Sequence, residues 1–204
     1  MTDLKRDWIG NKQSAFATIG ADGHSKQARA EYDYYATHPF AVELLLKEEQ
    51  FADTIWEPAC GEGHISKVLK AHGYQVISTD LIDRGFGVYG SLDFLACKEP
   101  IFDAVDFDII TNPPYSQSRE FAEKALELVK DGRKVAMFLK LTFLETKRRK
   151  AFFLQNPPRR VYVSANRLMC GRNGVFDSRL RAIAYAWYVW EKGFHGDPVI
   201  RWIN

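Results

Sequence analysis

The sequence has little of what marks secreted, metal-binding or membrane proteins. Its three cysteines, Cys60, Cys97 and Cys170, include no C-x-x-C pair, which argues against a zinc ribbon or a disulfide framework and favours a reducing compartment. The five histidines show no metal-ligand spacing, and no apolar run approaches the roughly 18 residues of a membrane span. Four of the first ten residues are charged, where a signal peptide needs an apolar core. We therefore expect a cytoplasmic protein that uses no metal and no membrane.

The length and composition fit one ordinary folded domain. The chain has 204 residues, of which 46% are hydrophobic, enough for one sizeable core but short for two. Residues 1–31 are polar and show neither a strand nor a helix period, so we expect a flexible arm there and a single domain over residues 32–204. The net charge of +2 indicates no partner by itself, and a monomer is the default expectation.

Beyond the arm, strand patterns alternate with helix patterns. Thr37, His38 and Pro39 predict the start of an amphipathic helix, with the proline in its first turn. Predicted strands cover residues 54–57, 75–79, 107–111, 134–140, 160–163 and 182–190, and predicted helices cover 64–72, capped by Gly73, and 118–129. This order predicts an α/β fold with a doubly wound, mostly parallel sheet and helices on both of its faces.

A strand that runs into a glycine turn is the first candidate binding feature. Residues 57–63 read Glu-Pro-Ala-Cys-Gly-Glu-Gly, and such a turn lets a ligand approach the backbone where a helix begins. Nineteen residues after Gly61, Asp80 ends the next strand, where an acidic side chain can accept hydrogen bonds from ribose hydroxyls. Together they indicate an adenosine-type ligand, although either feature alone also fits a plain turn.

The segment Asn112-Pro113-Pro114-Tyr115 directly follows the strand predicted over residues 107–111. An aromatic exocyclic amine is a poor nucleophile because its lone pair is delocalised into the ring. The Asn112 side-chain oxygen and the Pro113 carbonyl could accept its two hydrogens and align the nitrogen with an activated methyl group. The prolines stiffen the loop, and Tyr115 offers a flat face for stacking a base, worth roughly 1 to 3 kcal/mol. Alone, the segment also fits a turn before a helix.

On these motifs the chain resembles the S-adenosylmethionine-dependent DNA adenine-N6 methyltransferases, class I methyltransferases with an Asn-Pro-Pro-Tyr motif. The resemblance covers roughly residues 34–190. It implies a seven-stranded, Rossmann-like sheet whose antiparallel C-terminal hairpin comes from residues 160–163 and 182–190. It also implies S-adenosylmethionine as the cofactor and catalytic roles for Asn112, Pro113, Pro114 and Tyr115.

The same resemblance implies a set of cofactor contacts. Glu57 and Gly61 would face the methionine part of the cofactor, and Asp80 would face the ribose. Asp93 and Phe94 would hold the adenine ring, with the Asp93 carboxylate accepting from its amine. The remaining implied contacts are Tyr35 and Thr37, which would close over the methionine carboxylate, and Pro58, Ala59, Cys60, Gly63, Leu81 and Asn112.

The distribution of charge indicates a nucleic-acid partner. Between Lys140 and Arg181 there are 11 basic residues against two acidic ones, a net charge of +9, while the rest of the chain carries −7. We expect loose, salt-sensitive binding there, to DNA first and to RNA as an alternative. The expected contacts are Lys147, Arg148, Arg149, Lys150, Arg167 and Arg172. Members of the family usually carry a separate target-recognition domain, and we expect none within residues 32–204.

The sequence therefore predicts methyl transfer from S-adenosylmethionine to the N6 amine of adenine in DNA, with the base rotated out of the duplex. Two alternatives keep the same chemistry and change the acceptor: an amine of an RNA base, or the side-chain amide of glutamine in a protein. A third alternative, of another class, is a non-catalytic module that holds nucleic acid through its basic segment.

Overall fold

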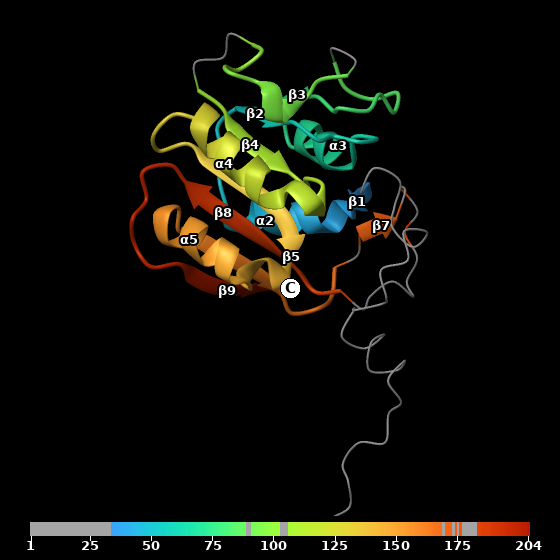
Figure 1. Cartoon of the computed structure of the whole chain (residues 1–204). Coiled ribbons are helices and arrows are strands. Elements are labelled where there is room, and N and C mark those ends of the chain that lie inside the picture. Colours follow the sequence, from blue (N-terminus) through green and yellow to red (C-terminus); the bar gives the residue numbers. More distant parts are fainter. Residues whose placement is uncertain are drawn as a thin grey trace, which may run out of the picture.

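The structure is a computed structural model that describes residues 34–88, 91–102, 106–168, 170–172, 174, 176 and 183–204. The arm predicted for residues 1–31 lies outside these residues. Figure 1 shows the arrangement of the helices and strands. In chain order they are β1 (Tyr35–Thr37), α2 (Pro39–Glu48), β2 (Thr54–Glu57), α3 (His64–Ala71), β3 (Gln75–Ser78), η3 (Phe94–Ala96), β4 (Asp108–Thr111), η4 (Tyr115–Gln117), α4 (Ser118–Leu128), β5 (Lys134–Lys140), η5 (Leu141–Leu144), α5 (Lys147–Gln155), β6 (Arg160–Ser164), β7 (Cys170–Arg172), β8 (Tyr185–Glu191) and β9 (Val199–Ile203), where η marks a 3₁₀ helix.

Within the described part of the chain, seven strands form one sheet in the order β3-β2-β4-β5-β8-β6-β9. β2 pairs in parallel with β3 and β4, and β4 pairs in parallel with β5. β8 is antiparallel to both β5 and β6, whereas β9 is parallel to β6. A mostly parallel sheet with an antiparallel strand contributed late in the chain confirms the predicted fold class. The edge strand β9 was not predicted.

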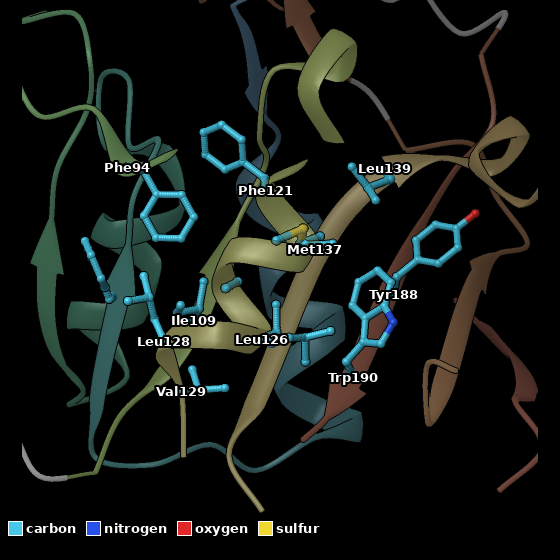
Figure 2. Packing of buried hydrophobic residues seen from close by; sticks show 14 of the residues in the cluster. Phe94, Ile109, Phe121, Leu126, Leu128, Val129, Met137, Leu139, Tyr188 and Trp190 are labelled. Carbon is cyan, nitrogen blue, oxygen red and sulfur yellow. The ribbon is translucent and has the colours of Figure 1, made fainter. Parts of the chain in front are cut away.

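Helices cover both faces of the sheet because successive residues of a strand point to opposite sides. On one face, Ile109 of β4 and Tyr188 of β8 pack with α4 and α5. Figure 2 shows this cluster, with Phe121 of α4 beside the strand residues. On the other face, Ile110 and Trp187 pack with α2 and α3. The two buried faces confirm the doubly wound arrangement.

The strongly periodic elements lie close to their predicted ranges. β2 and β5 match their predicted bounds, and α3 ends at Ala71, with Gly73 at a φ of +89° beyond its C-terminus. His38 is the N-cap of α2, and its ring Nδ1 accepts a hydrogen bond from the Phe40 N–H at 3.2 Å. The strand predicted over residues 182–190 begins at Tyr185 in the structure, and position 182 lies outside the described residues.

A second, two-stranded sheet pairs β1 with β7 in antiparallel register (Figure 1). Tyr35 lies opposite Arg172, and Thr37 lies opposite Cys170. Each strand has three residues, too short to show a periodic pattern, and neither was predicted. This small sheet matters for the site because it packs against the loop that follows β4.

Candidate active site

A cavity of about 450 Å³ lies at the carboxyl edge of β2, β3 and β4. Ala59 after β2, Asp80 after β3 and Asn112 after β4 line it, since the carboxyl ends of parallel strands meet at one edge of a sheet. Phe94 and Leu95 of η3 form a further, apolar wall. This volume lies within the range of about 300 to 1,000 Å³ that is usual for small-molecule sites. The structure thus brings the three predicted strand ends together around one space.

The Asp80 carboxylate is engaged within its own turn. Its Oδ2 accepts from the Gly61 N–H at 2.7 Å and its Oδ1 from the Ile82 N–H at 2.9 Å, while the Arg84 guanidinium lies 3.4 Å from Oδ1. A carboxylate offers about four acceptor positions, so about one remains for a ligand hydroxyl. A parallel bridge between Asp80 and Ser91 aligns the next loop along the same cavity.

Asp93 and Phe94, the pair expected to hold an adenine ring, both line the cavity. The Asp93 Oδ1 accepts from the Leu95 N–H at 3.0 Å and caps η3, and the residue is exposed. Phe94 is 2% exposed and packs edge-on against Trp56 and tilted against Phe121, with ring centroids 5.1 Å apart in both pairs. Most of the Phe94 ring therefore belongs to the core.

Two aromatic rings of the protein itself close the glycine turn after β2. Gly61 and Gly63 have φ values of +54° and +77°, a conformation that favours glycine. A Cβ on Gly61 would lie 2.4 Å from the Tyr34 ring, and one on Gly63 would lie 2.3 Å from the Phe86 ring. The sequence led us to expect a ligand against these glycines. In the structure the Tyr34 and Phe86 rings lie where a Cβ would be, and Tyr34 also lines the cavity.

Tyr34 is held in place by contacts on both sides. Its hydroxyl lies 3.2 Å from the Glu62 carboxylate, to which it donates, and 3.3 Å from the Glu62 N–H, from which it accepts. The Arg84 guanidinium lies 4.5 Å from the centre of the Tyr34 ring, within reach of a cation–π interaction. Burial raises the pKa of Tyr34 to about 12, so the phenol stays neutral at physiological pH.

Glu57 is buried at the end of β2 with 1% of its surface exposed. Its Oε2 accepts from the Ser66 N–H at 2.9 Å and from the Ser66 hydroxyl, which lies 2.6 Å from the Ser78 hydroxyl. Burial raises the pKa of Glu57 to about 8 although both hydrogen bonds oppose the change. The carboxyl group is therefore mostly protonated at neutral pH, and its hydrogen bonds join β2 to α3.

We expect Glu57→Gln to change how stability depends on pH. The folded protein holds a proton on Glu57 up to about pH 8, whereas the unfolded chain releases it near 4.5. The unfolded state therefore binds fewer protons between these values, and the contribution of Glu57 to stability falls as pH rises through them. Glutamine does not titrate, so the variant lacks this fall. Urea unfolding across this range measures it, and parallel profiles for the two proteins would contradict the assignment.

Asn112 lies between the 450 Å³ cavity and the small sheet. Its Nδ2 donates to the Tyr35 backbone carbonyl at 2.6 Å and lies 3.9 Å from the Cys170 sulfur. Its Oδ1 is buried and has no hydrogen-bond partner among the described residues. An unsatisfied buried acceptor costs roughly 1 to 3 kcal/mol, so Oδ1 is positioned to gain from a ligand N–H. Of the prolines that follow, Pro113 is buried and Pro114 lines the cavity.

Tyr115 is covered, which differs from the open stacking face that the sequence predicts. Its ring centroid lies 5.1 Å from that of Tyr35 and 6.0 Å from that of Tyr185, and its hydroxyl lies 3.2 Å from the Cys170 sulfur. The Lys140 ammonium lies 4.7 Å from the ring centre. The cover arises because β1 and β7 pack across the loop after β4. Tyr35 therefore lies against the Tyr115 ring where a stacked base is expected.

A second cavity, which we call the small cavity, measures about 20 Å³ and lies beside Asn112, with residues of β1, β2 and α3 in its walls. Glu57 and Cys60 line it, as do three residues with unpartnered buried atoms: Thr37 Oγ1, His64 Nδ1 and Asn112 Oδ1. In the described part of the chain, one other buried side-chain polar atom has no hydrogen-bond partner, the hydroxyl oxygen of Thr111. Because buried polar atoms are normally satisfied, their clustering here indicates a ligand site.

The basic segment contains side chains with structural partners. Arg149, expected to contact nucleic acid, donates instead to backbone carbonyls within η5 and just after its end at 3.0 to 3.5 Å, so it stabilises that turn. Arg159 pairs with Glu191 at 2.9 Å, and Arg160 pairs with Glu49 at 2.8 Å. These three arginines therefore make contacts within the protein.

Other members of the segment are exposed. Lys147, Arg148 and Lys150 lie exposed on α5, and Arg167 is exposed after β6. The side chain of Arg172 lies outside the described residues. The surface of α5 is therefore the part of the segment in which several exposed cations lie together.

Among the site residues that the sequence reasoning missed, four make the contacts described above: Tyr34, His64, Arg84 and Cys170. Tyr34 and His64 adjoin predicted site residues, Tyr35 and Gly63, and that adjacency was the available signal. For Arg84 and Cys170 the sequence contains no such signal. Cys170 meets Tyr115 across 55 residues of sequence, a contact that local patterns do not reveal.

The described residues hold no group of three or more His, Cys, Asp or Glu side chains that could bind a metal ion. All three cysteines are buried free thiols. No helix in the same part of the chain is long and apolar enough to cross a membrane.

Comparisons with known proteins identify the fold. No family model matches the chain, and neither does any curated protein. Among solved structures, a protein of Listeria monocytogenes assigned as a class I S-adenosylmethionine-dependent methyltransferase aligns with a TM-score of 0.55 and 15% identity over 93% of this chain and 70% of its own. A protein of Vibrio vulnificus assigned as a type I restriction enzyme modification subunit aligns with a TM-score of 0.53 and 15% identity over 91% of this chain.

This chain spans about half of that modification subunit, 48% of its length. A protein of Pyrococcus horikoshii assigned as an RNA methyltransferase aligns with a TM-score of 0.50 and 16% identity, over 76% of this chain and 85% of its own. At such low identity these similarities show the fold and not the reaction. The chain has the class I, Rossmann-like methyltransferase fold.

Proposed function

We propose that this chain transfers the methyl group of S-adenosylmethionine to the N6 amine of adenine in DNA. The observation that carries the proposal concerns Asn112, which lines the 450 Å³ cavity: its buried Oδ1 has no hydrogen-bond partner among the residues that the structure describes. The class I methyltransferase fold supports S-adenosylmethionine as the methyl donor. The similarity to a modification subunit supports DNA as the acceptor.

The residues around the cavity fit an adenosine-containing cofactor. Asp80 keeps about one acceptor position for a ribose hydroxyl, and the exposed Asp93 carboxylate can accept from an adenine amine beside Phe94. The unpartnered atoms of the small cavity would receive polar groups of the methionine end. When bound, S-adenosylmethionine supplies a methyl group activated by its sulfonium. The further contacts we propose are Tyr35, Thr37, Glu57, Pro58, Ala59, Cys60, Gly61, Gly63 and Leu81, of which Pro58, Ala59, Tyr35 and Leu81 line the larger cavity.

In the proposed mechanism, Asn112 and Pro113 orient the target amine. The Asn112 Oδ1 and the Pro113 carbonyl accept its two hydrogens, which directs the nitrogen lone pair toward the donor. Asn112 is held for this by the 2.6 Å hydrogen bond from its Nδ2 to the Tyr35 carbonyl, and the two prolines restrict the loop before substrate binds. A strong base is not required, because the amine proton becomes acidic only once the nitrogen is methylated.

Stacking of the target base on Tyr115 requires the small sheet to shift. Tyr35 covers the Tyr115 ring at a centroid distance of 5.1 Å. A planar base that replaced Tyr35 would keep an aromatic contact on the same ring, so the exchange would cost little stacking energy. The base itself must leave its duplex, at a cost of a few kcal/mol.

We expect DNA binding to depend on α5. Replacing Lys147, Arg148 and Lys150, which are exposed, by glutamine removes three charges. If each cation neutralises one phosphate, the slope of log affinity against log salt becomes shallower by about 0.9 per contact, or 2 to 3 in all. As a control, glutamine at the exposed Lys47, in the last turn of α2, and at the exposed Lys130, after the end of α4, should leave the slope unchanged. An equal change in both variants would argue against a DNA-binding role for α5.

The direct test incubates the protein with S-adenosylmethionine labelled in its methyl group and, separately, with DNA, RNA and a protein extract. We expect label in DNA, and mass spectrometry of the digested nucleosides should identify N6-methyladenine. The Asn112→Ala protein is the negative control. Label in RNA or protein alone would replace DNA with that acceptor, and no label in any of them would favour the non-catalytic binding module.

A further inference from the structure

We infer that His64 is a ligand for the α-ammonium group of the cofactor, which it would hold in the small cavity together with Thr37 and Asn112. The inference rests on the proposed function, because it takes an amino-acid-bearing cofactor as the occupant. It adds a residue that the glycine turn does not predict, and it specifies the charge of the group that the small cavity accepts.

The small cavity is formed by three separate elements. Thr37 ends β1, His64 is the first residue of α3, and Asn112 follows β4. Thr37 is 2% exposed, and its Oγ1 has no partner among the described residues. The His64 ring packs edge-on against Phe176 at 5.5 Å, and its Nδ1 is also buried and unpartnered. Three residues that are distant in sequence, each with a buried atom that has no hydrogen-bond partner among the described residues, thus line one space.

The chemistry of these atoms favours a donor group. Asn112 Oδ1 can only accept hydrogen bonds, Thr37 Oγ1 can accept one, and Nδ1 of a neutral His64 accepts when the ring proton is on Nε2. A primary ammonium can donate one N–H to each of the three atoms, whereas a carboxylate could accept from Thr37 and His64 but would be repelled by Asn112 Oδ1, which only accepts. The cavity of about 20 Å³ has room for one group the size of a water molecule. The second lone pair of Asn112 Oδ1 remains for the target amine.

The surrounding groups keep the small cavity compatible with a cation. The titratable or charged side chains around His64 are Tyr34, Tyr35, Glu57, Cys60, Glu62 and Lys67. Burial lowers the pKa of His64, with Lys67 adding to the effect and Glu62 opposing it, so the imidazole is neutral at pH 7. Glu57 is uncharged below its pKa of about 8, and burial raises the pKa of both Tyr34 and Cys60 to about 12.

This arrangement makes cofactor affinity sensitive to acid. Because the pKa of His64 is lowered from the usual histidine value of 6.5, its ring gains a proton only at a pH below that value. The resulting imidazolium has no acceptor nitrogen and repels an ammonium group. The contribution of His64 to affinity should therefore fall as the pH drops below about 6.5. Asparagine at position 64 can present an oxygen close to the position of Nδ1 without titrating, so His64→Asn should keep the affinity and lose the fall.

The test is calorimetric binding of S-adenosylhomocysteine and of its analogue that lacks the α-amino group. His64→Ala should weaken binding of S-adenosylhomocysteine about 10- to 100-fold, the usual range for a hydrogen bond to a charged group. It should leave binding of the analogue unchanged. His72→Asn, at the exposed C-terminal end of the same helix, is the matched control and should behave as wild type. Circular dichroism melting of each variant checks folding.

The outcomes separate the inference from the proposed function. An equal loss of affinity for both ligands in His64→Ala would overturn the ammonium assignment while leaving S-adenosylmethionine as the cofactor. A fall in affinity at acid pH that persists in His64→Asn would also overturn the ammonium assignment. This second test does not depend on whether His64→Ala folds. If neither ligand binds the wild-type protein, the proposed cofactor and this inference are both overturned.

Discussion

Replacing Asn112 by alanine is expected to lower the rate of methyl transfer about 10²- to 10³-fold at saturating cofactor, the usual cost of removing one preorganised hydrogen-bonding group. Two effects combine. The variant loses the buried Oδ1 acceptor that we assign to the target amine, and it loses the 2.6 Å hydrogen bond that joins the loop after β4 to Tyr35. Single-turnover assays with labelled cofactor and DNA measure the chemical step apart from product release.

The Asn112→Asp protein separates the two effects. Aspartate keeps side-chain acceptor oxygens but has no N–H to donate to the Tyr35 carbonyl, so its rate should lie between those of wild type and Asn112→Ala. Cofactor affinity of the alanine variant should also weaken, by about 10- to 100-fold, because Asn112 Oδ1 is one of the acceptors that we assign to the cofactor ammonium. The rates are therefore compared at saturating cofactor. If Asn112→Ala retains a rate within about threefold of wild type, Asn112 does not orient the amine.

The central strands and three of the helices, α2, α3 and α4, could be predicted from the sequence because local patterns determine them. β2, β4 and β5 are short apolar runs next to turn residues, and Gly73 ends α3 in the positive-φ conformation that the pattern implies. β1, β7 and β9 could not be predicted, since two have three residues and β9 is mostly exposed. Their pairing partners lie far away in the sequence, so no local period marks them.

The position of the candidate site could be predicted, but not the state of its side chains. The rule that ligands bind at the carboxyl ends of parallel strands placed Asp80 and Asn112 at one cavity, and the structure brings them together. The same rule is silent on which protein groups already occupy those ends. Tyr34 lies against Gly61, and Tyr35 covers Tyr115, because a segment from before the sheet folds back over its edge.

Replacing Trp187 by alanine is expected to destabilise the protein by about 3 to 5 kcal/mol, the usual cost of removing a buried tryptophan side chain. Trp187 is fully buried in β8, its ring centroid lies 5.0 Å from that of Phe138, and its Nε1 donates to the Ala41 carbonyl at 2.8 Å. The variant loses the packing between the sheet and α2 and the hydrogen bond from the indole to that carbonyl.

The matched control is Trp202→Ala in β9, where the same side chain is 72% exposed and its removal should cost no more than about 0.5 kcal/mol. Scanning calorimetry should place the melting temperature of Trp187→Ala roughly 6 to 20 °C below that of wild type, with Trp202→Ala close to wild type. Since α2 follows β1 directly in the chain, a loosened α2 also frees the strand whose Tyr35 holds Asn112. Trp187→Ala should therefore lose methyl transfer at temperatures below its own melting transition, and activity that persists up to that transition would show that the site does not depend on how α2 is anchored.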